Sequence, residues 1–319
     1  MIERWYPRGV STPEARLRYY AARYDTVEVD STFYGLPREE FARNWAARTP
    51  EGFTFHIKAY GLMTGHEVDE RSLPPELREY DYELTNSGRV RRPDERMVER
   101  SFELFVDALQ PLVAAGKMGG VLMQYPPYFT ADDGEHERRN LAEIDRAAAI
   151  LSPLPVFVEF RHPSWLTGAR FERTMRFLVD RGLTFVAVDT PRLTGSSVIP
   201  RVAAATSHLG YVRFHGRNSA TWAARTSSAA DRFDYLYSPQ ELAEWRDPLR
   251  RLAAETDRTW VMFNNCKYDY APRNAREMAE ILGDVVAPRV GGLETGNAAT
   301  DEPAALTPGR DRTDMDRLF

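Results

Sequence analysis

The sequence predicts an α/β fold of the TIM (β/α)8 type, in which parallel strands form a closed barrel inside a ring of helices. Seven short apolar runs each stop at a charged or amide residue, and amphipathic helical patterns separate them. Strands of such a barrel are covered on both faces, so their polar residues gather where each strand leaves the core. In a TIM barrel these carboxyl-terminal strand ends form the active face.

The seven runs mark the predicted strands in chain order. They are VEVD at 27–30, FTFHIK at 53–58, GGVLMQ at 119–124, VFVEFRH at 156–162, FVAVD at 185–189, YVRFHGR at 211–217 and WVMFNN at 260–265. The helices are predicted from apolar residues spaced three or four positions apart. The first helix spans about 13–24 and begins with Thr12 as its N-cap. Ser238 and Glu241 form a capping box at the start of a later helix, which Pro248 should kink or divide.

The eightfold pattern is one strand short. The first strand of an eightfold barrel should precede the helix at 13–24, where only about ten residues are present. Either a strand precedes the start of this sequence or the barrel is open on one side, and the first alternative is favoured because barrels avoid exposed edges. We expect a TIM-like barrel over 1–283, with its first strand missing or truncated. Residues 284–319, rich in Gly, Pro, Asp, Arg and Thr without periodicity, should form a disordered tail.

Composition sets broad limits on the class of protein. A chain of 319 residues with 43% hydrophobic residues can form one barrel, which takes about 250 residues. The net charge of -5 argues against broad attraction to nucleic acid or anionic membranes. The single cysteine, Cys266, forms no intrachain disulfide and is expected to be a buried thiol. Without a membrane-length apolar run or a secretory signal, the protein is expected to be cytoplasmic.

The segment VEFRHPSW carries the strongest candidate site. Glu159 and Arg161 alternate onto one face at a strand end, and Pro163 stops the strand from continuing. In one interpretation Glu159 is an acid/base and Arg161 holds an anionic substrate. In the other, the two side chains form a structural ion pair that braces the barrel mouth.

The segment YVRFHGR carries a second candidate site. Arg213 and His215 lie on one side of a strand, and Arg217 follows in the loop. Two guanidiniums and an imidazole suit a phosphate or carboxylate, which TIM barrels often hold near their last strands. Alternatively, Arg213 pairs with Asp189 or Glu159, and His215 is a hydrogen-bonded core residue.

Further strand ends add candidate ligands. Lys58 either contacts a carbonyl or anion or pairs with Glu28. Asn264 either orients substrate hydroxyls or satisfies loop backbone. The ligand types of metal-dependent barrel enzymes are present as Glu28, Glu159, Asp189 and His215. The neighbouring cations would oppose a metal ion, so we predict no cofactor and keep a divalent metal as the alternative.

The connection over residues 60–94 is longer than an ordinary barrel loop and leaves from the presumed active face. It carries His66 and is long enough to close over a ligand. The segment at its side of the barrel contains Gln124, Tyr125 and Tyr128. These aromatic side chains suit a sugar ring or a base, or else they pack the loops onto the barrel.

Six motifs occur in order along residues 5 to about 283. They are VEVDSTFYGLP at 27–37, FHIK at 55–58 with TGH at 64–66, GGVLMQYPPYF at 119–129, VEFRHPSW at 158–165, YVRFHGR at 211–217 and FNN at 263–265. Together they resemble the domain-of-unknown-function 72 (DUF72, YecE-like) family. The resemblance implies a TIM-barrel fold but no reaction, because the activity of that family is not established. Members usually open with a glycine-rich strand containing Gly-Trp, which this sequence lacks.

We expect an enzyme of hydrolase or isomerase type that acts on a small anionic or polyhydroxylated substrate at the carboxyl-terminal rim. The candidate catalytic residues are Glu159, Asp189 and His215. The candidate substrate-binding residues are Glu28, Lys58, His66, Gln124, Tyr125, Arg161, Arg213, Arg217 and Asn264.

Two alternatives remain open. One is a noncatalytic ligand-binding barrel. The other is a nuclease-like DNA-processing protein recruited by its tail, because Leu318 and Phe319 end the chain as in the short peptides that bacterial proteins dock into the DNA sliding clamp. Metal dependence and clamp binding would distinguish this last alternative from the others.

Overall fold

The computed structural model of the protein describes residues 5–191, 199–222 and 233–287. Seven parallel strands form one curved sheet in the order β1-β2-β6-β7-β8-β9-β10, and all seven predicted strands are confirmed. They are β1 (Thr26–Val29), β2 (Thr54–Lys58), β6 (Met118–Gln124), β7 (Val156–Glu159), β8 (Thr184–Asp189), β9 (Leu209–Phe214) and β10 (Arg258–Phe263).

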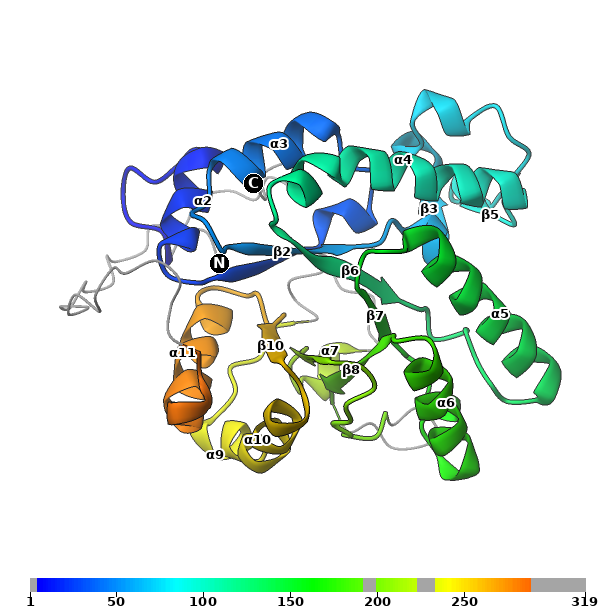
Figure 1. Ribbon diagram of the computed structural model, residues 1–319. Helices are drawn as coiled ribbons and strands as arrows, with labels where there is room; N and C mark the ends of the chain where they lie inside the picture. Colours follow the sequence, from blue (N-terminus) through cyan, green and yellow to red (C-terminus); the bar gives the residue numbers. More distant parts are fainter. Residues whose placement is uncertain (1–4, 192–198, 223–232, 288–319) are drawn as a thin grey trace.

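The helices surround this sheet. They are α2 (Pro13–Ala21), α3 (Glu39–Ala47), α4 (Glu95–Ala114), α5 (Gly134–Leu151), α6 (Gly168–Asp180), α7 (Ser219–Trp222), α9 (Pro239–Ala243), α10 (Arg246–Glu255) and α11 (Tyr270–Leu282). Figure 1 shows α2, α3 and α4 along one side of the sheet and α9, α10 and α11 along another. Both halves of the predicted capping box are present at Ser238 and Glu241. Pro248 lies in the first turn of α10, where its missing N–H is tolerated, so the predicted helix is divided.

The barrel is nearly closed, and the predicted TIM-like class is confirmed. Each strand pairs in parallel with the next, and β1 and β10 are the two edges of the described sheet, with no backbone pairing between them. Beside this edge, the hydroxyl of Tyr24 donates a hydrogen bond of 3.0 Å to the carbonyl of Pro272. The segment before β1 is therefore joined to α11 by a hydrogen bond from a side chain to the backbone rather than by strand pairing.

The long connection after β2 is an ordered subdomain. It contains a small antiparallel sheet in the order β3-β5-β4, built from Val68–Asp69, Arg89–Arg91 and Glu83–Leu84. Leu77 and Val90 in this subdomain are fully buried and belong to the hydrophobic core, whereas Leu84 is exposed. The connection thus packs firmly beside α4, as Figure 1 shows, and its closure over a ligand stays a prediction.

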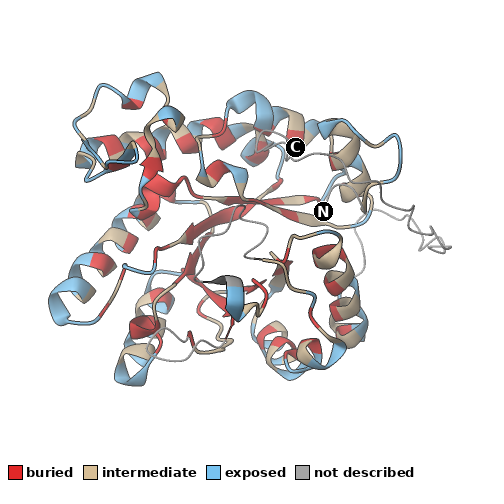
Figure 2. Cartoon of the chain, turned by 180° about the vertical axis from the view of Figure 1, so that it is seen from behind, coloured by how far each residue is buried: buried red, intermediate tan, exposed pale blue. Residues whose placement is uncertain are grey.

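An aromatic layer fills the barrel below the strand ends, in the region of buried strands that Figure 2 shows in red. The ring of His56 lies 5.2, 5.0 and 4.6 Å from those of Phe157, Tyr211 and Trp260, measured between centroids. A Cβ atom at position 119 would lie 2.7 Å from the imidazole, so Gly119 makes room for this ring. The layer closes the barrel beneath the polar strand ends.

His56 is an uncharged polar group within this layer. It is fully buried, and neither ring nitrogen has a hydrogen-bond partner within the described part of the chain. Burial disfavours the charged imidazolium and lowers the pKa of His56 to about 3. The folded protein therefore keeps His56 neutral over most of the acidic pH range.

Replacing His56 with Leu should make stability less sensitive to acid. The unfolded chain protonates this histidine near pH 6.5, whereas the folded chain does so only near pH 3. The unfolded state therefore binds more protons in this window, and stability falls as pH drops from about 6.5 towards 3. Between pH 7.5 and 4.5, the His56→Leu variant should lose about 3 kcal/mol less unfolding free energy than the wild type. Chemical denaturation at both pH values measures this difference.

The matched control is His208→Leu, because His208 is exposed and lies outside the barrel interior. This control should keep the pH dependence of the wild type. An equal loss of stability in His56→Leu and the wild type would contradict the assignment of acid sensitivity to His56.

Candidate functional site

A buried ion-pair network lies at the carboxyl-terminal ends of the strands. Arg213 on β9 is fully buried and donates to both carboxylate oxygens of Glu28 on β1, with its Nε 2.9 Å from Oε2. Its Nη1 donates to Oε2 of Glu159 on β7 at 2.6 Å. The hydroxyl of Tyr211 donates a further bond of 2.8 Å to Glu28. One guanidinium thus joins three strands that are not neighbours in the sheet.

Glu159 is the most heavily bonded carboxylate in this network. Besides Arg213, it accepts hydrogen bonds from Gln124 at 2.8 Å and Arg161 at 3.2 Å, and Nε2 of His215 lies 3.1 Å from it. Burial alone would raise the pKa of Glu159, but the positive charge of Arg213 and the other donors hold it well below its usual range. A carboxylate so fixed in its ionised form orients its neighbours rather than moving protons.

His215 is fully buried beside the same network. Its Nε2 lies 3.1 Å from Oε1 of Glu159 and 3.2 Å from Nη1 of Arg213, and its Nδ1 lies 3.1 Å from Nδ2 of Asn264. Burial lowers the pKa of His215 to about 4, so the imidazole is neutral near pH 7. Of the residues predicted from the sequence, the structure brings Glu28, Gln124, Glu159, Arg161, Arg213, His215 and Asn264 together.

Lys58 lies at the mouth beside Asp30, a carboxylate that was not among the predicted site residues. Its Nζ is 3.3 Å from Oδ1 of Asp30 and 4.5 Å from the ring centre of Phe33. The alternative in which Lys58 pairs with Glu28 is wrong, because Arg213 occupies that carboxylate. Asp30 follows Glu28 by two positions, and this spacing is the signal that could have identified it.

His66 joins this mouth from the connection after β2. Its Nδ1 lies 2.8 Å from the hydroxyl of Thr64, and its ring packs edge-on against Phe33 at 4.9 Å. Burial, with the positive charges of Lys58 and Arg161, lowers the pKa of His66 to about 4. Lys58, Arg161 and His66 therefore form one electrostatic group, which we call the mouth group.

Asp189 belongs to a separate cluster on the outer face of the barrel. It pairs in register with Phe214 rather than Arg213, so its side chain points away from the interior. Its carboxylate accepts bonds of 2.9 and 2.8 Å from Arg217, 2.8 Å from Tyr237 and 2.7 Å from Trp245. Sequence reasoning grouped Asp189 and Arg217 with the inner residues because it counted strand ends without tracking which face each side chain takes.

The outer cluster still acts on the inner site through the backbone. The carbonyl of Asp189 accepts from the N–H of His215 at 2.9 Å, and the hydroxyl of Tyr237 accepts from the N–H of Gly216 at 2.8 Å. A Cβ at position 216 would lie 2.8 Å from Tyr235, so this close approach requires glycine. The outer cluster therefore fixes the main chain that carries His215.

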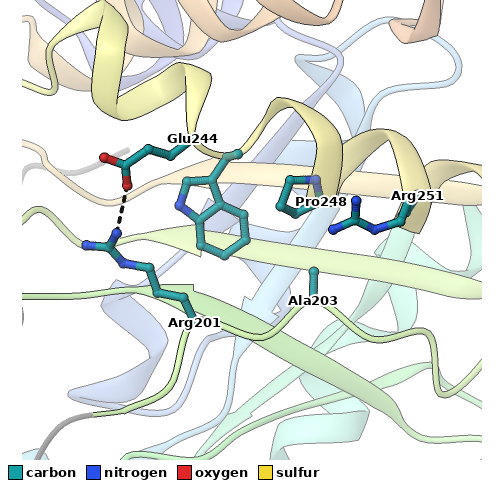
Figure 3. A pocket seen from close by; sticks show the side chains of 6 residues that line it. Arg201, Ala203, Glu244, Pro248 and Arg251 are labelled. Carbon is teal, nitrogen blue, oxygen red and sulfur yellow. Dashed lines mark hydrogen bonds and ion pairs between the residues drawn. The ribbon is translucent and has the colours of Figure 1, made fainter.

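A pocket adjoins the outer cluster. It encloses about 310 Å³ and is lined by Arg201, Ala203, Glu244, Trp245, Pro248 and Arg251. Figure 3 shows the ion pair between Arg201 and Glu244, 2.8 Å long, at one end of it. Arg201 also lies 3.1 Å from Asp189, which places the pocket outside the barrel rather than at its mouth.

Tyr125 does not reach the mouth. Gln124 pairs in register with Glu159 and points inward, so the next residue, Tyr125, points outward. Its ring is buried and stacks on Phe129 at 4.2 Å. Direct contact of Tyr125 with a substrate, as the sequence suggested, is therefore not favoured by the structure.

Within residues 5–191, 199–222 and 233–287, no three His, Cys, Asp or Glu side chains gather as metal ligands. Nor does this part of the chain contain a helix with the length and apolar character that crossing a bilayer requires. The predicted absence of a cofactor stays a prediction.

The chain is similar to known proteins over nearly its whole length. A family model described as "Protein of unknown function DUF72" matches residues 1–294. The UPF0759 protein YunF of Bacillus subtilis (strain 168) is 29% identical over 281 residues, which cover 87% of this chain and 89% of YunF.

Solved structures show the same fold. The crystal structure of a DUF72 family protein from Thermotoga maritima MSB8 has a TM-score of 0.67 at 28% identity, covering 87% of this chain and 92% of that one. One from Enterococcus faecalis V583 has a TM-score of 0.69 at 24% identity, covering 86% and 89%. The six motifs, the seven-stranded barrel and the family-model match agree, and the chain belongs to the DUF72 family.

Proposed function

We propose that this protein is an enzyme that binds a small anionic, polyhydroxylated substrate at the barrel mouth and acts on it by hydrolase- or isomerase-type acid/base chemistry. The observation that carries the proposal is the mouth group of Lys58, Arg161 and His66, placed beside the buried Arg213 network. Cations and a neutral imidazole, brought together from the ends of β2 and β7, are the elements that such chemistry needs.

The two cations of the mouth group suit an anionic group of the substrate. The side chains of Lys58 and Arg161 are 12% and 16% exposed, and each is held by a carboxylate, Asp30 and Glu159 respectively. Held in place before the ligand arrives, they lose little conformational freedom when they bind a phosphate or carboxylate. The amides of Gln124 and Asn264 lie close by to meet hydroxyl groups.

His66 is the best candidate for moving protons. It is neutral near pH 7, whereas Glu159 is locked in its ionised form and Asp189 faces the outer cluster. A bound anion would offset the charges of Lys58 and Arg161, which lower the pKa of His66, and would so strengthen it as a base. Glu159 and His215 then act as positioning residues for the mouth.

The nuclease-like alternative depends on Leu318 and Phe319, which lie outside the described residues. Recruitment to a sliding clamp therefore stays a prediction. The noncatalytic ligand-binding barrel makes the same binding predictions as the enzyme and differs from it in turnover.

Removing either cation of the mouth group should weaken anion binding. Arg161→Gln and Lys58→Met should each raise the Kd for inorganic phosphate and for ribose 5-phosphate about tenfold or more, because each loses a charge-assisted hydrogen bond. Isothermal titration calorimetry at pH 7.5 measures both affinities. The control is Arg43→Gln, an exposed arginine on α3, which should bind like the wild type. Unchanged affinity in both mouth variants would contradict the proposed anion site.

Removing the imidazole should impair turnover more than binding. In a panel of phosphorylated sugars followed by NMR, His66→Gln should lower kcat about a hundredfold and change Kd by less than about threefold. For the wild type, kcat/KM should decline as pH falls towards about 4, where free His66 gains a proton, and this limb should vanish in the variant.

The exposed His136→Gln on α5 serves as the control and should keep wild-type kinetics. Circular dichroism at each pH confirms that the protein remains folded. If panel members bind but none is converted, the noncatalytic barrel is the better description. A variant at His66 with wild-type kcat would remove this residue from the proton-transfer role.

A further inference from the structure

A row of rings lies beside the mouth group. Phe33 contacts Tyr34 at 5.2 Å and His66 at 4.9 Å, and His66 in turn lies 6.5 Å from Tyr128, measured between ring centroids. The four residues come from the segments that follow β1, β2 and β6, all at the carboxyl-terminal side of the barrel. We call this row of Phe33, Tyr34, His66 and Tyr128 the aromatic shelf.

The two ends of the aromatic shelf are open to solvent. Tyr34 is 50% exposed and Tyr128 is 63% exposed, whereas most aromatic side chains of the described chain are buried or partly buried. Tyr128 is nonetheless held in place, because its hydroxyl donates a bond of 2.8 Å to the carbonyl of Gly65. A ring that is fixed and exposed offers a ready surface for stacking.

The shelf adjoins the cations. Nζ of Lys58 lies 4.5 Å from the ring centre of Phe33. Lys58 and Arg161 are also close enough to His66 to lower its pKa, after burial as the larger cause. A ligand whose anionic group contacts these cations can therefore lay an attached ring on the shelf.

Two polar atoms of the shelf are already engaged. The hydroxyl of Tyr128 bonds to Gly65, and Nδ1 of His66 bonds to Thr64. The rings contact one another edge-on, and the exposed rings of Tyr34 and Tyr128 offer apolar surface to a ligand. A flat heteroaromatic base can stack on such rings, and base–aromatic stacking strengthens binding about fivefold or more per base.

We propose that the substrate is a nucleoside monophosphate. Its phosphate would bind Lys58 and Arg161, its ribose hydroxyls would meet the nearby amides of Gln124 and Asn264, and its base would stack on the aromatic shelf. This inference rests on the proposed function, because it uses the same anion site. Stacking depends little on which base is present, so the shelf selects for a base rather than for one particular base.

Matched ligands separate the contribution of the base from that of the phosphate. Adenosine 5′-monophosphate should bind about tenfold or more tighter than ribose 5-phosphate in calorimetric titrations of the full chain. Tyr128→Ala should bring the two affinities to within about threefold of each other and leave ribose 5-phosphate binding unchanged. Tyr128→Phe, which keeps the ring, should retain most of the preference for the nucleotide. Phe41→Ala, at an exposed ring on α3, is the control for removal of a surface aromatic.

The outcomes distinguish this inference from the proposal on which it rests. Equal binding of adenosine 5′-monophosphate and ribose 5-phosphate by the wild type, or a preference that survives in Tyr128→Ala, would overturn the role of the shelf and leave the anion site standing. If phosphate, ribose 5-phosphate and the nucleotide all fail to bind, the anion site itself is refuted.

Discussion

The barrel mouth depends on the pairing of one buried guanidinium, Arg213, with two carboxylates. A fully buried charge is tolerated only when its partners are present, and loss of one partner typically costs about 3–5 kcal/mol. Because Glu28 stands on an edge strand, its bonds to Arg213 link β1 to β9 through the barrel interior. This contact works where no backbone ladder joins β1 to β10 in the described sheet. The same interaction therefore stabilises the fold and sets the position of Glu159 and, through it, His215 and Arg161.

The network also explains why residues that look reactive in the sequence have supporting roles. A carboxylate surrounded by donors, such as Glu159, is held in one protonation state, and an enclosed imidazole such as His215 has little access to a substrate. Asp189 is similarly saturated on the outer face, where it anchors the backbone before Arg217. The side chains that a bound ligand can still influence lie at the mouth. There, burial and the positive charge of Lys58 lower the pKa of His66.

The strands and their polar ends could be predicted from the sequence because they follow from local hydrophobic pattern. The ion-pair partners of these polar residues could not be predicted, because they depend on which strands face one another across the barrel. The pairing of Arg213 with Glu159 was one of the predicted alternatives. Its pairing with Glu28 was not predicted, because the two residues lie 185 positions apart in the sequence. The predicted positions of Asp189 and Tyr125 were wrong for a different reason. The alternation of side chains along a strand gives their orientation only when the register with the neighbouring strand is known. The ordered sheet after β2 was missed because its strands are only two or three residues long.

The buried groups that hold the barrel mouth and the groups available to a ligand are different side chains, and this bears on how function varies within such a fold. The buried groups that fix geometry come from β1, β7, β8 and β9, whereas the partly exposed groups of the mouth follow β1, β2, β6 and β7. Fold alone fixes no reaction, since function resides in the site built on it. Changes at Arg213 or Asp189 would disturb the frame as a whole, whereas changes at Tyr128 or His66 would alter what the frame recognises. Substrate choice in this protein is therefore expected to be encoded in the segments after the early strands.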